Sequence, residues 1–277
     1  MPTAPVEVTE DHRDEELEAT LDETATRLLD EGDERLSRTW PQLLSTGTVA
    51  GLEVGFGLLA LLAVQEATGS HLLAGLAFSV GFLALLMGRS ELFTESFFVP
   101  VITVVAGRKS LRDLARLWSS TLVMNLVGGW MITWLAMTGY PRLHATALEA
   151  GTHFVESGWT LQAFVLSVLA GAAITLMTRM QHGTEEMVGK VVAAVAGAFV
   201  IAGLEMHHSV LDSLLAFAAL HVGAPFGYTD WAGFFVFTLV GNLVGGVGLV
   251  TALRLVRSYP RIQQERREQG VALPAEG

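Results

Sequence analysis

The sequence predicts an all-α membrane protein with six transmembrane helices in two inverted three-helix repeats, with the second and fifth helices broken. Hydrophobic residues make up 51% of its 277 residues and charged residues only 16%, whereas a soluble domain carries about 25% charge. The pentapeptide Asn-Leu-Val-Gly-Gly occurs twice, at 125–129 and 242–246. Each copy follows an apolar stretch that polar residues interrupt, and matching broken segments in two halves are typical of transporters built from internal repeats.

Charge is concentrated at the N-terminus, because 13 of the 28 acidic residues lie in the first 34 positions. Residues 1–40 are therefore expected to form an acidic cytoplasmic tail with one helix. Its leucines make only a thin apolar stripe, which favours a solvated helix over a partner-binding module. Residues 41–258 are predicted to form the transmembrane domain, and 259–277 a cytoplasmic C-terminal tail. The absence of cysteine excludes disulfides and thiolate metal sites.

Six apolar stretches are long enough to span a bilayer, whose core of about 30 Å needs about 20 helical residues. They cover approximately 46–65, 72–106, 114–137, 160–177, 187–220 and 231–255. The second and fifth are too long for one crossing and lack the turn residues that two crossings need. We expect each to form a half-helix, a non-helical loop at membrane depth and a second short helix. Such a loop is tolerated only where protein buries it or where it lines a water-accessible cavity.

The positions of the basic residues predict how the chain is oriented in the membrane. With the N-terminus in the cytoplasm, 15 of the 17 lysines and arginines fall in cytoplasmic segments, as the positive-inside rule requires. Both termini are therefore predicted to be cytoplasmic. Each half holds three spans, an odd number, so the halves must be inverted, with the outer loop 138–159 as the seam between them.

The second interruption, 205–212, holds the adjacent histidines His207 and His208. An ionisable group at membrane depth costs about 2.5 kcal/mol or more, so each is a candidate functional residue. An imidazole titrates near neutral pH and can donate a proton to an anion or hold one by a charge-assisted hydrogen bond. We expect one histidine to be packed structurally and the other to face a pathway.

The first interruption, 89–95, offers the counterpart Leu92-Phe93-Thr94. A bulky apolar pair can close a pore, and a threonine hydroxyl can bond a histidine or a passing anion. Ordinary packing of the loop against the fifth span stays open as an alternative.

Charged residues bracket that loop. Arg89, Glu91 and Glu95 are expected to pair with one another or to cap the loop backbone, because isolated charges there would be expensive. Attraction of anions by Arg89 is a weaker alternative. Structural pairing is also favoured for Glu53, in the first span.

The repeated motif places Asn125 and Asn242 before paired glycines. Glycines let neighbouring membrane helices approach closely. Each asparagine can then bond the freed backbone of the adjacent broken helix, and exposure of Asn242 to the lumen is left open.

Together these motifs resemble the formate/nitrite transporter family. The resemblance rests on Glu91-Leu-Phe-Thr94, on His208-Ser-Val and on the repeated Asn-Leu-Val-Gly-Gly, and it covers about residues 46–256. It implies an aquaporin-like protomer in a homo-pentamer of the cell membrane. Each protomer would pass small monovalent anions with proton involvement, without enzymatic activity, cofactor, metal or nucleic acid.

The resemblance also implies roles for individual residues. The substrate pathway would include His208, Thr94, His207, Asn242 and Asn125. The apolar constrictions would be formed by Phe78, Phe82, Leu92, Phe93 and Ile201. The loops would be supported by Arg89, Glu91, Glu95 and Asp212.

The chain also departs from the family pattern. Family members have Glu and Asn where His207 and Asp212 stand here, and a vestibule lysine for which His153 is a weak stand-in. The resemblance is therefore to a divergent branch.

The predicted function is a channel or transporter for small monovalent anions such as formate, nitrite, acetate or hydrosulfide, with proton transfer through His208. A neutral-solute channel of the aquaporin type is an alternative, although neither break contains Asn-Pro-Ala. An intramembrane enzyme or metal site is a third alternative, and it would have to be built from Glu205, His207, His208 and Asp212. Only His208 and Asp212 would lie on one face of a helix. Catalytic zinc needs three protein ligands, which counts against this alternative. A sensor that uses the acidic helix is a further alternative.

Overall fold

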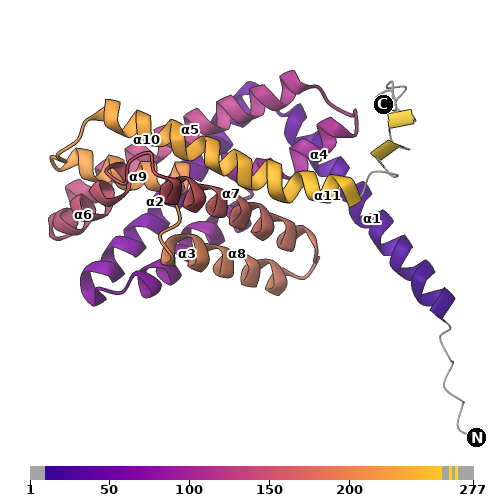
Figure 1. Cartoon of the computed structure of the whole chain (residues 1–277), viewed down its shortest axis with the longest axis horizontal. Helices are drawn as coiled ribbons and strands as arrows, with labels where there is room; N and C mark the ends of the chain where they lie inside the picture. Colours follow the sequence, from indigo (N-terminus) through magenta and orange to yellow (C-terminus); the bar gives the residue numbers. More distant parts are fainter. Residues whose placement is uncertain (1–9, 258–261, 264–265, 268–277) are drawn as a thin grey trace, which may run out of the picture.

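The computed structural model describes residues 10–257, 262–263 and 266–267, and the regular elements among these residues are all helices, with no strand. Figure 1 shows its elements. They are α1 (Glu10–Ser37), α2 (Trp40–Thr68), α3 (His71–Gly88), η1 (Phe93–Phe97), α4 (Val99–Val105), α5 (Leu111–Gly139), η2 (Pro141–Leu143), α6 (His144–Val155), α7 (Leu161–His182), α8 (Met187–Gly203), α9 (Ser209–His221), α10 (Tyr228–Leu243), η3 (Val244–Thr251) and α11 (Ala252–Arg257). Residues 1–9 and most of 259–277, predicted as tails, lie outside the described residues.

Five of these helical stretches are long and apolar enough to cross a membrane. They are α2, α3, α5, α7 and the continuous stretch Tyr228–Val256 that joins α10, η3 and α11. This confirms the predicted all-α membrane fold. The sixth span and the inverted relation of the halves stay predictions, because α8 and α9 are shorter apolar helices.

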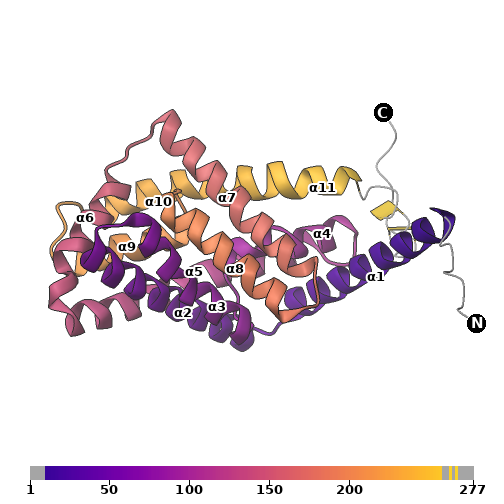
Figure 2. The same ribbon diagram turned by 90° about the horizontal axis from the view of Figure 1, so that it is seen from below.

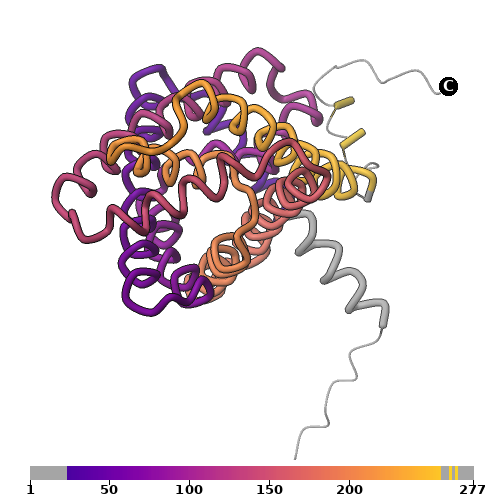
Figure 3. Tube along the Cα trace, turned by 60° about the vertical axis from the view of Figure 1, so that its left-hand side comes forward, coloured from indigo at the N-terminus to yellow at the C-terminus, as the bar shows by residue number. Residues whose placement is uncertain are grey.

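Both predicted helix breaks are present. α3 stops at Gly88 and the chain resumes as the 3₁₀ helix η1 and then α4, while α8 stops at Gly203 and resumes at α9. Arg89 (φ 52°) and Glu205 (φ 50°) follow these two stops in the left-handed conformation that ends helices. α3 packs along α8 (Figure 3), so the two half-helices that lead into the loops lie together.

Glycines let the intact helices approach each other at backbone distance. Gly51 of α2 lies against the carbonyl of Asn125 in α5, and Gly245 lies against the carbonyl of Val168 in α7. The first Asn-Leu-Val-Gly-Gly copy stays within regular α-helix, whereas the second runs into η3, a π-helix. π-Helical turns are rare, and this difference between the two copies is not predicted by their identical sequences.

Two peripheral helices differ from expectation. α6 lies in the segment predicted only as an outer loop, packs on α9, and stands at the opposite end of the molecule from α1 (Figures 1 and 2). α1 was expected to be a solvated helix, but that is wrong for its C-terminal part: α1 packs on α4, and Leu36 is buried in a cluster with Leu43, Val101, Leu114 and Leu117.

The contact between α3 and α8 gives a stability prediction. A Cβ atom at Gly75 would collide with the backbone of Gly203, so Gly75→Val should separate the two half-helices. Overpacking of this kind costs about 1–3 kcal/mol, which should lower the melting temperature of the purified protein in detergent. Gly139→Val is the matched control, because a Cβ there meets nothing within 4 Å; equal melting temperatures for the two variants would contradict the expectation.

Candidate functional site

One hydrogen bond joins the two broken helices at the centre of the molecule. The Oγ1 atom of Thr94, in η1, lies 3.0 Å from Nε2 of His208, at the start of α9. Both side chains are buried, with exposed fractions of 0% and 1%. The two residues that the sequence singles out on opposite loops therefore contact each other.

The second ring nitrogen of His208 fixes the direction of that bond. Nδ1 accepts a hydrogen bond of 3.1 Å from the backbone N–H of Leu211, so His208 acts as the N-terminal cap of α9. In a neutral imidazole one nitrogen accepts and the other donates. Nε2 therefore carries the proton and donates it to Thr94 Oγ1, and the threonine hydroxyl retains its own hydrogen for another acceptor.

The first loop is held by Asn125. Its Oδ1 accepts from the backbone N–H of Phe93 at 2.8 Å, and its Nδ2 donates to the carbonyls of Glu91 at 3.0 Å and Gly47 at 2.9 Å. One side chain thus ties η1 to α2 and α5.

Asn242 makes the same set of bonds to the second loop. Its Oδ1 accepts from Ser209 N–H at 2.9 Å, and its Nδ2 donates to the carbonyls of His207 at 2.9 Å and Ser167 at 2.8 Å. Both asparagines are fully buried. Backbone groups occupy the polar atoms of both side chains, as expected for loop support, and a place for Asn125 and Asn242 on the substrate pathway stays a prediction.

Asp212 supports the second loop as expected. Its Oδ2 accepts from the backbone N–H of His208 at 2.7 Å. Together with the cap made by the His208 ring, this bond fixes the backbone and side chain of the central histidine.

The expected pairing among Arg89, Glu91 and Glu95 is wrong for Glu91. Its buried carboxylate is bound by two guanidinium groups, those of Arg35 in α1 and of Arg38, directly after α1. Arg89 is exposed and ends α3, and Glu95 is partly buried in η1. A carboxylate at this depth needs compensation, and the compensation comes from a helix outside the broken segment.

The five residues proposed as constrictions all belong to one hydrophobic cluster. Phe78, Phe82, Leu92, Phe93 and Ile201 are each at most 3% exposed. Leu85 and Leu211 are members that sequence reasoning missed. Leu85 follows Phe78 and Phe82 on the same face of α3, a spacing that was available as a signal.

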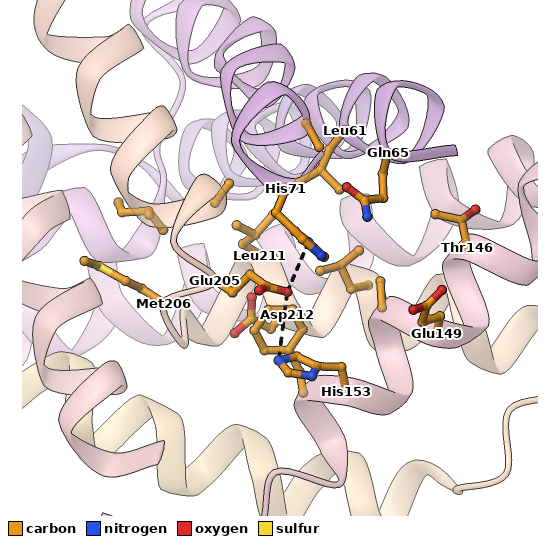
Figure 4. A pocket seen from close by; sticks show the side chains of 16 residues that line it. Leu61, Gln65, His71, Thr146, Glu149, His153, Glu205, Met206, Leu211 and Asp212 are labelled. Carbon is orange, nitrogen blue, oxygen red and sulfur yellow. Dashed lines mark ion pairs between the residues drawn. The ribbon is translucent and has the colours of Figure 1, made fainter. Parts of the chain in front are cut away.

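Two cavities adjoin this cluster from opposite ends. One, of about 230 Å³, is lined by Ile201 and Leu211 together with residues of α2, α3 and α6 (Figure 4). The other, of about 570 Å³, is lined by Leu85 and Glu95 together with residues of α1 and α7. We call them the α6-side cavity and the α1-side cavity. The Thr94–His208 bond thus lies inside the bundle, beside an apolar cluster that each of the two cavities adjoins.

His207 is the packed member of the histidine pair. Its ring contacts Phe154 and Phe234 edge-on, with centroid separations of 5.4 and 5.9 Å. Within residues 10–257 and the four further described residues, no group of three His, Cys, Asp or Glu side chains is placed to hold a metal ion. The metal-site alternative thus has no geometric support there.

The hydrogen bonds of Asn125 and Asn242 to the two loops give a second stability prediction. Asn242→Leu should leave the backbone groups of His207 and Ser209 unpaired, at about 1–3 kcal/mol each, and should lower the melting temperature by several degrees; Asn125→Leu should do the same for the first loop. Thr133→Val is the control, because its buried hydroxyl bonds only carbonyls of its own helix. A melting temperature for either leucine variant as high as that of Thr133→Val would contradict the loop-supporting role of that asparagine.

Comparison with known proteins identifies the chain. A sequence model described as formate/nitrite transporter matches residues 22–256. The chain is 25% identical over 243 residues to the formate channel BtFdhC of Bacillus thuringiensis, a match that covers 83% of this chain and 92% of the relative. It is 26% identical over 261 residues to the inner membrane protein YfdC of Escherichia coli, covering 87% and 82%.

Solved structures show the same fold. An FNT family ion channel superposes with a TM-score of 0.72 at 18% identity, covering 86% of this chain and 99% of that one. A pentameric formate channel with formate bound gives a TM-score of 0.66 at 20% identity, covering 80% and 98%. The family consists of membrane channels and transporters rather than enzymes. This chain is a multi-pass membrane protein that belongs to the formate/nitrite transporter family.

Proposed function

We propose that the chain is a channel or transporter for small monovalent anions of the formate, nitrite, acetate and hydrosulfide class. Support comes from its family and from relatives and a solved neighbour named as formate channels. It would act in the cell membrane as a homo-pentamer with a pathway in each protomer, because that neighbour is titled pentameric. Both termini would be cytoplasmic, so the α1-side cavity faces the cytoplasm and the α6-side cavity faces outwards.

The observation that carries this proposal is the buried Thr94–His208 bond beside an apolar cluster that two cavities adjoin. A bare anion entering the apolar cluster would lose its hydration at a large cost. Its conjugate acid carries no charge and can be held by hydrogen bonds alone. A pathway with one polar pair and apolar walls therefore suits a weak acid that crosses in neutral form.

The central pair can hold a crossing acid. The Thr94 hydroxyl hydrogen is directed away from His208, because its oxygen accepts the Nε2 proton, so the hydroxyl can donate a hydrogen bond to an oxygen of the acid. Transfer of the Nε2 proton would leave an imidazolate, because Nδ1 carries no proton. We therefore propose that the pair binds the acid by hydrogen bonds and keeps its own protons.

A substrate panel tests the function. Purified protein in liposomes should equilibrate at least one of labelled formate, nitrite, acetate and hydrosulfide faster than empty vesicles, and faster at acid than at neutral pH. Equal rates with and without protein for the whole panel would end the anion proposal.

The role of the pair is tested by Thr94→Val. This nearly isosteric change removes the hydroxyl and leaves Nε2–H of His208 without its partner. We expect flux to fall about tenfold, the effect of one buried hydrogen bond of about 1–1.5 kcal/mol. Thr103→Val is the control, since that buried hydroxyl bonds only Val99 of its own helix. Wild-type flux in Thr94→Val would exclude the pair from the pathway.

A further inference from the structure

A groove on the outer surface of the bundle is separate from the two cavities beside the apolar cluster. It lies between α7 and the end of the last helical stretch and has a volume of about 340 Å³. Its lining residues are Leu176 and Arg179 of α7, Leu249 and Val250 of η3, and Leu253 and Arg254 of α11. None of them lines the α6-side or the α1-side cavity, so the groove has no part in the proposed pathway.

The two walls of the groove run in the same direction. Gly241 of α10 lies against Ser167 of α7, and Gly246 of η3 lies against Thr175 further along α7. Because residue numbers rise together along this contact, α7 and the last stretch are parallel. Both end on the side of the bundle where α1 lies: His182, the last residue of α7, contacts α1, and α11 stands at the same end of the molecule as α1 (Figures 1 and 2).

Along each wall an apolar side chain comes first and an arginine follows. Leu176 precedes Arg179 by three residues, and Leu249 precedes Arg254 by five. The two leucines are 43% and 49% exposed, although they lie on helices long and apolar enough to cross a membrane. The groove is therefore apolar towards the middle of the bundle and basic towards its end.

This order matches one kind of ligand. The described lining residues include no aspartate or glutamate, and Arg179 is exposed while Arg254 is partly exposed. A guanidinium group binds phosphate oxygens through parallel N–H bonds, and a hydrocarbon chain covers leucine side chains as well as another leucine does. A free phosphate would leave the leucines uncovered, and an apolar helix would give the arginines no counter-charge. A molecule with a phosphate head and a hydrocarbon tail satisfies both parts of the groove.

The sequence continues the positive charge beyond the groove. Five arginines lie between positions 254 and 267, directly after the last spanning stretch. Clusters of four to eight basic residues in this position attract anionic lipid headgroups on the cytoplasmic side. The predicted topology places this end of the bundle on that side.

The wall formed by η3 is also joined to the first loop. The Thr251 hydroxyl, at the end of η3, donates a hydrogen bond of 2.8 Å to the carbonyl of Phe97, and Gly246 lies against the Phe97 ring. A ligand that fills the groove would therefore pack on the π-helix that helps to hold η1 in place.

We propose that this groove is a binding site for a phospholipid with a net negative headgroup. The phosphate is bound by Arg179 and Arg254, and one acyl chain lies along Leu176, Leu249 and Leu253. This inference does not depend on which solute the protein passes.

Native mass spectrometry of the full-length protein, titrated in detergent with phosphatidylglycerol and with phosphatidylcholine of the same acyl chains, tests the site. The wild type should bind phosphatidylglycerol more tightly. One basic residue beside an anionic headgroup changes the affinity about fivefold, so Arg179→Gln should weaken phosphatidylglycerol binding by about that factor and Arg179→Gln/Arg254→Gln should weaken it further. Binding of phosphatidylcholine should change little.

Arg112→Gln is the matched control. This arginine is exposed in the first turn of α5 and does not line the groove, so its loss removes the same charge without touching the site. Equal melting temperatures without added lipid would show that all variants fold. Added phosphatidylglycerol should raise the melting temperature of the wild type and of Arg112→Gln more than that of the double variant, because a ligand of the folded state stabilises it.

Three results would overturn the lipid site. The first is equal phosphatidylglycerol affinity for the wild type, Arg112→Gln and the double variant. The second is displacement of the lipid by excess inorganic phosphate, which would mean that the acyl chain contributes nothing. The third is a double variant with altered subunit stoichiometry in a protein without preference for phosphatidylglycerol, which would assign the groove to a contact between copies of the chain. A failure of the anion panel would leave all of these measurements interpretable.

Discussion

The structure depends on satisfying the backbone of the two buried loops that follow α3 and α8. The backbone groups of Glu91, Phe93, His207 and Ser209 are buried, and an unpaired group in hydrocarbon costs several kcal/mol. Asn125 and Asn242 meet this requirement with one acceptor and two donor bonds each. The contact of Thr94 with His208 is made between the loops that these two side chains hold.

An asparagine bonds each of the two loops in the same way, but the functional side chains that the loops carry are different. The same asparagine geometry places a threonine from one loop against a histidine from the other. Charge compensation also differs: Glu91 in the first loop is bound by Arg35 and Arg38, whereas Glu205 beyond α8 is near two histidines in an open cavity. The nearest partners of Glu91 are thus guanidinium groups, whereas those of Glu205 are imidazoles, although the two loops are supported alike.

The sequence predicted what local pattern and composition determine. The polar interruptions predicted the two helix breaks, and the repeated asparagines predicted the hydrogen bonds to the loops. It did not predict the partners of Glu91, because Arg35 and Arg38 lie in or directly after a separate helix and no periodicity links them to the loop. The contacts of Glu205 with His71 and His153 in the α6-side cavity were missed for the same reason, since these residues come from the end of α8, from α3 and from α6. The π-helix η3 packs against α7 and is not determined by the motif alone, which is α-helical in its other copy.

The attachment of α1 has a consequence for the order in which the protein is made. α1 precedes the apolar helices described here, yet Arg35 and Arg38 find their partner only in Glu91, beyond α2 and α3. These ion pairs can form only after α3 has been synthesised and placed. The docking of α1 therefore follows the placement of two helices that come after it in the chain.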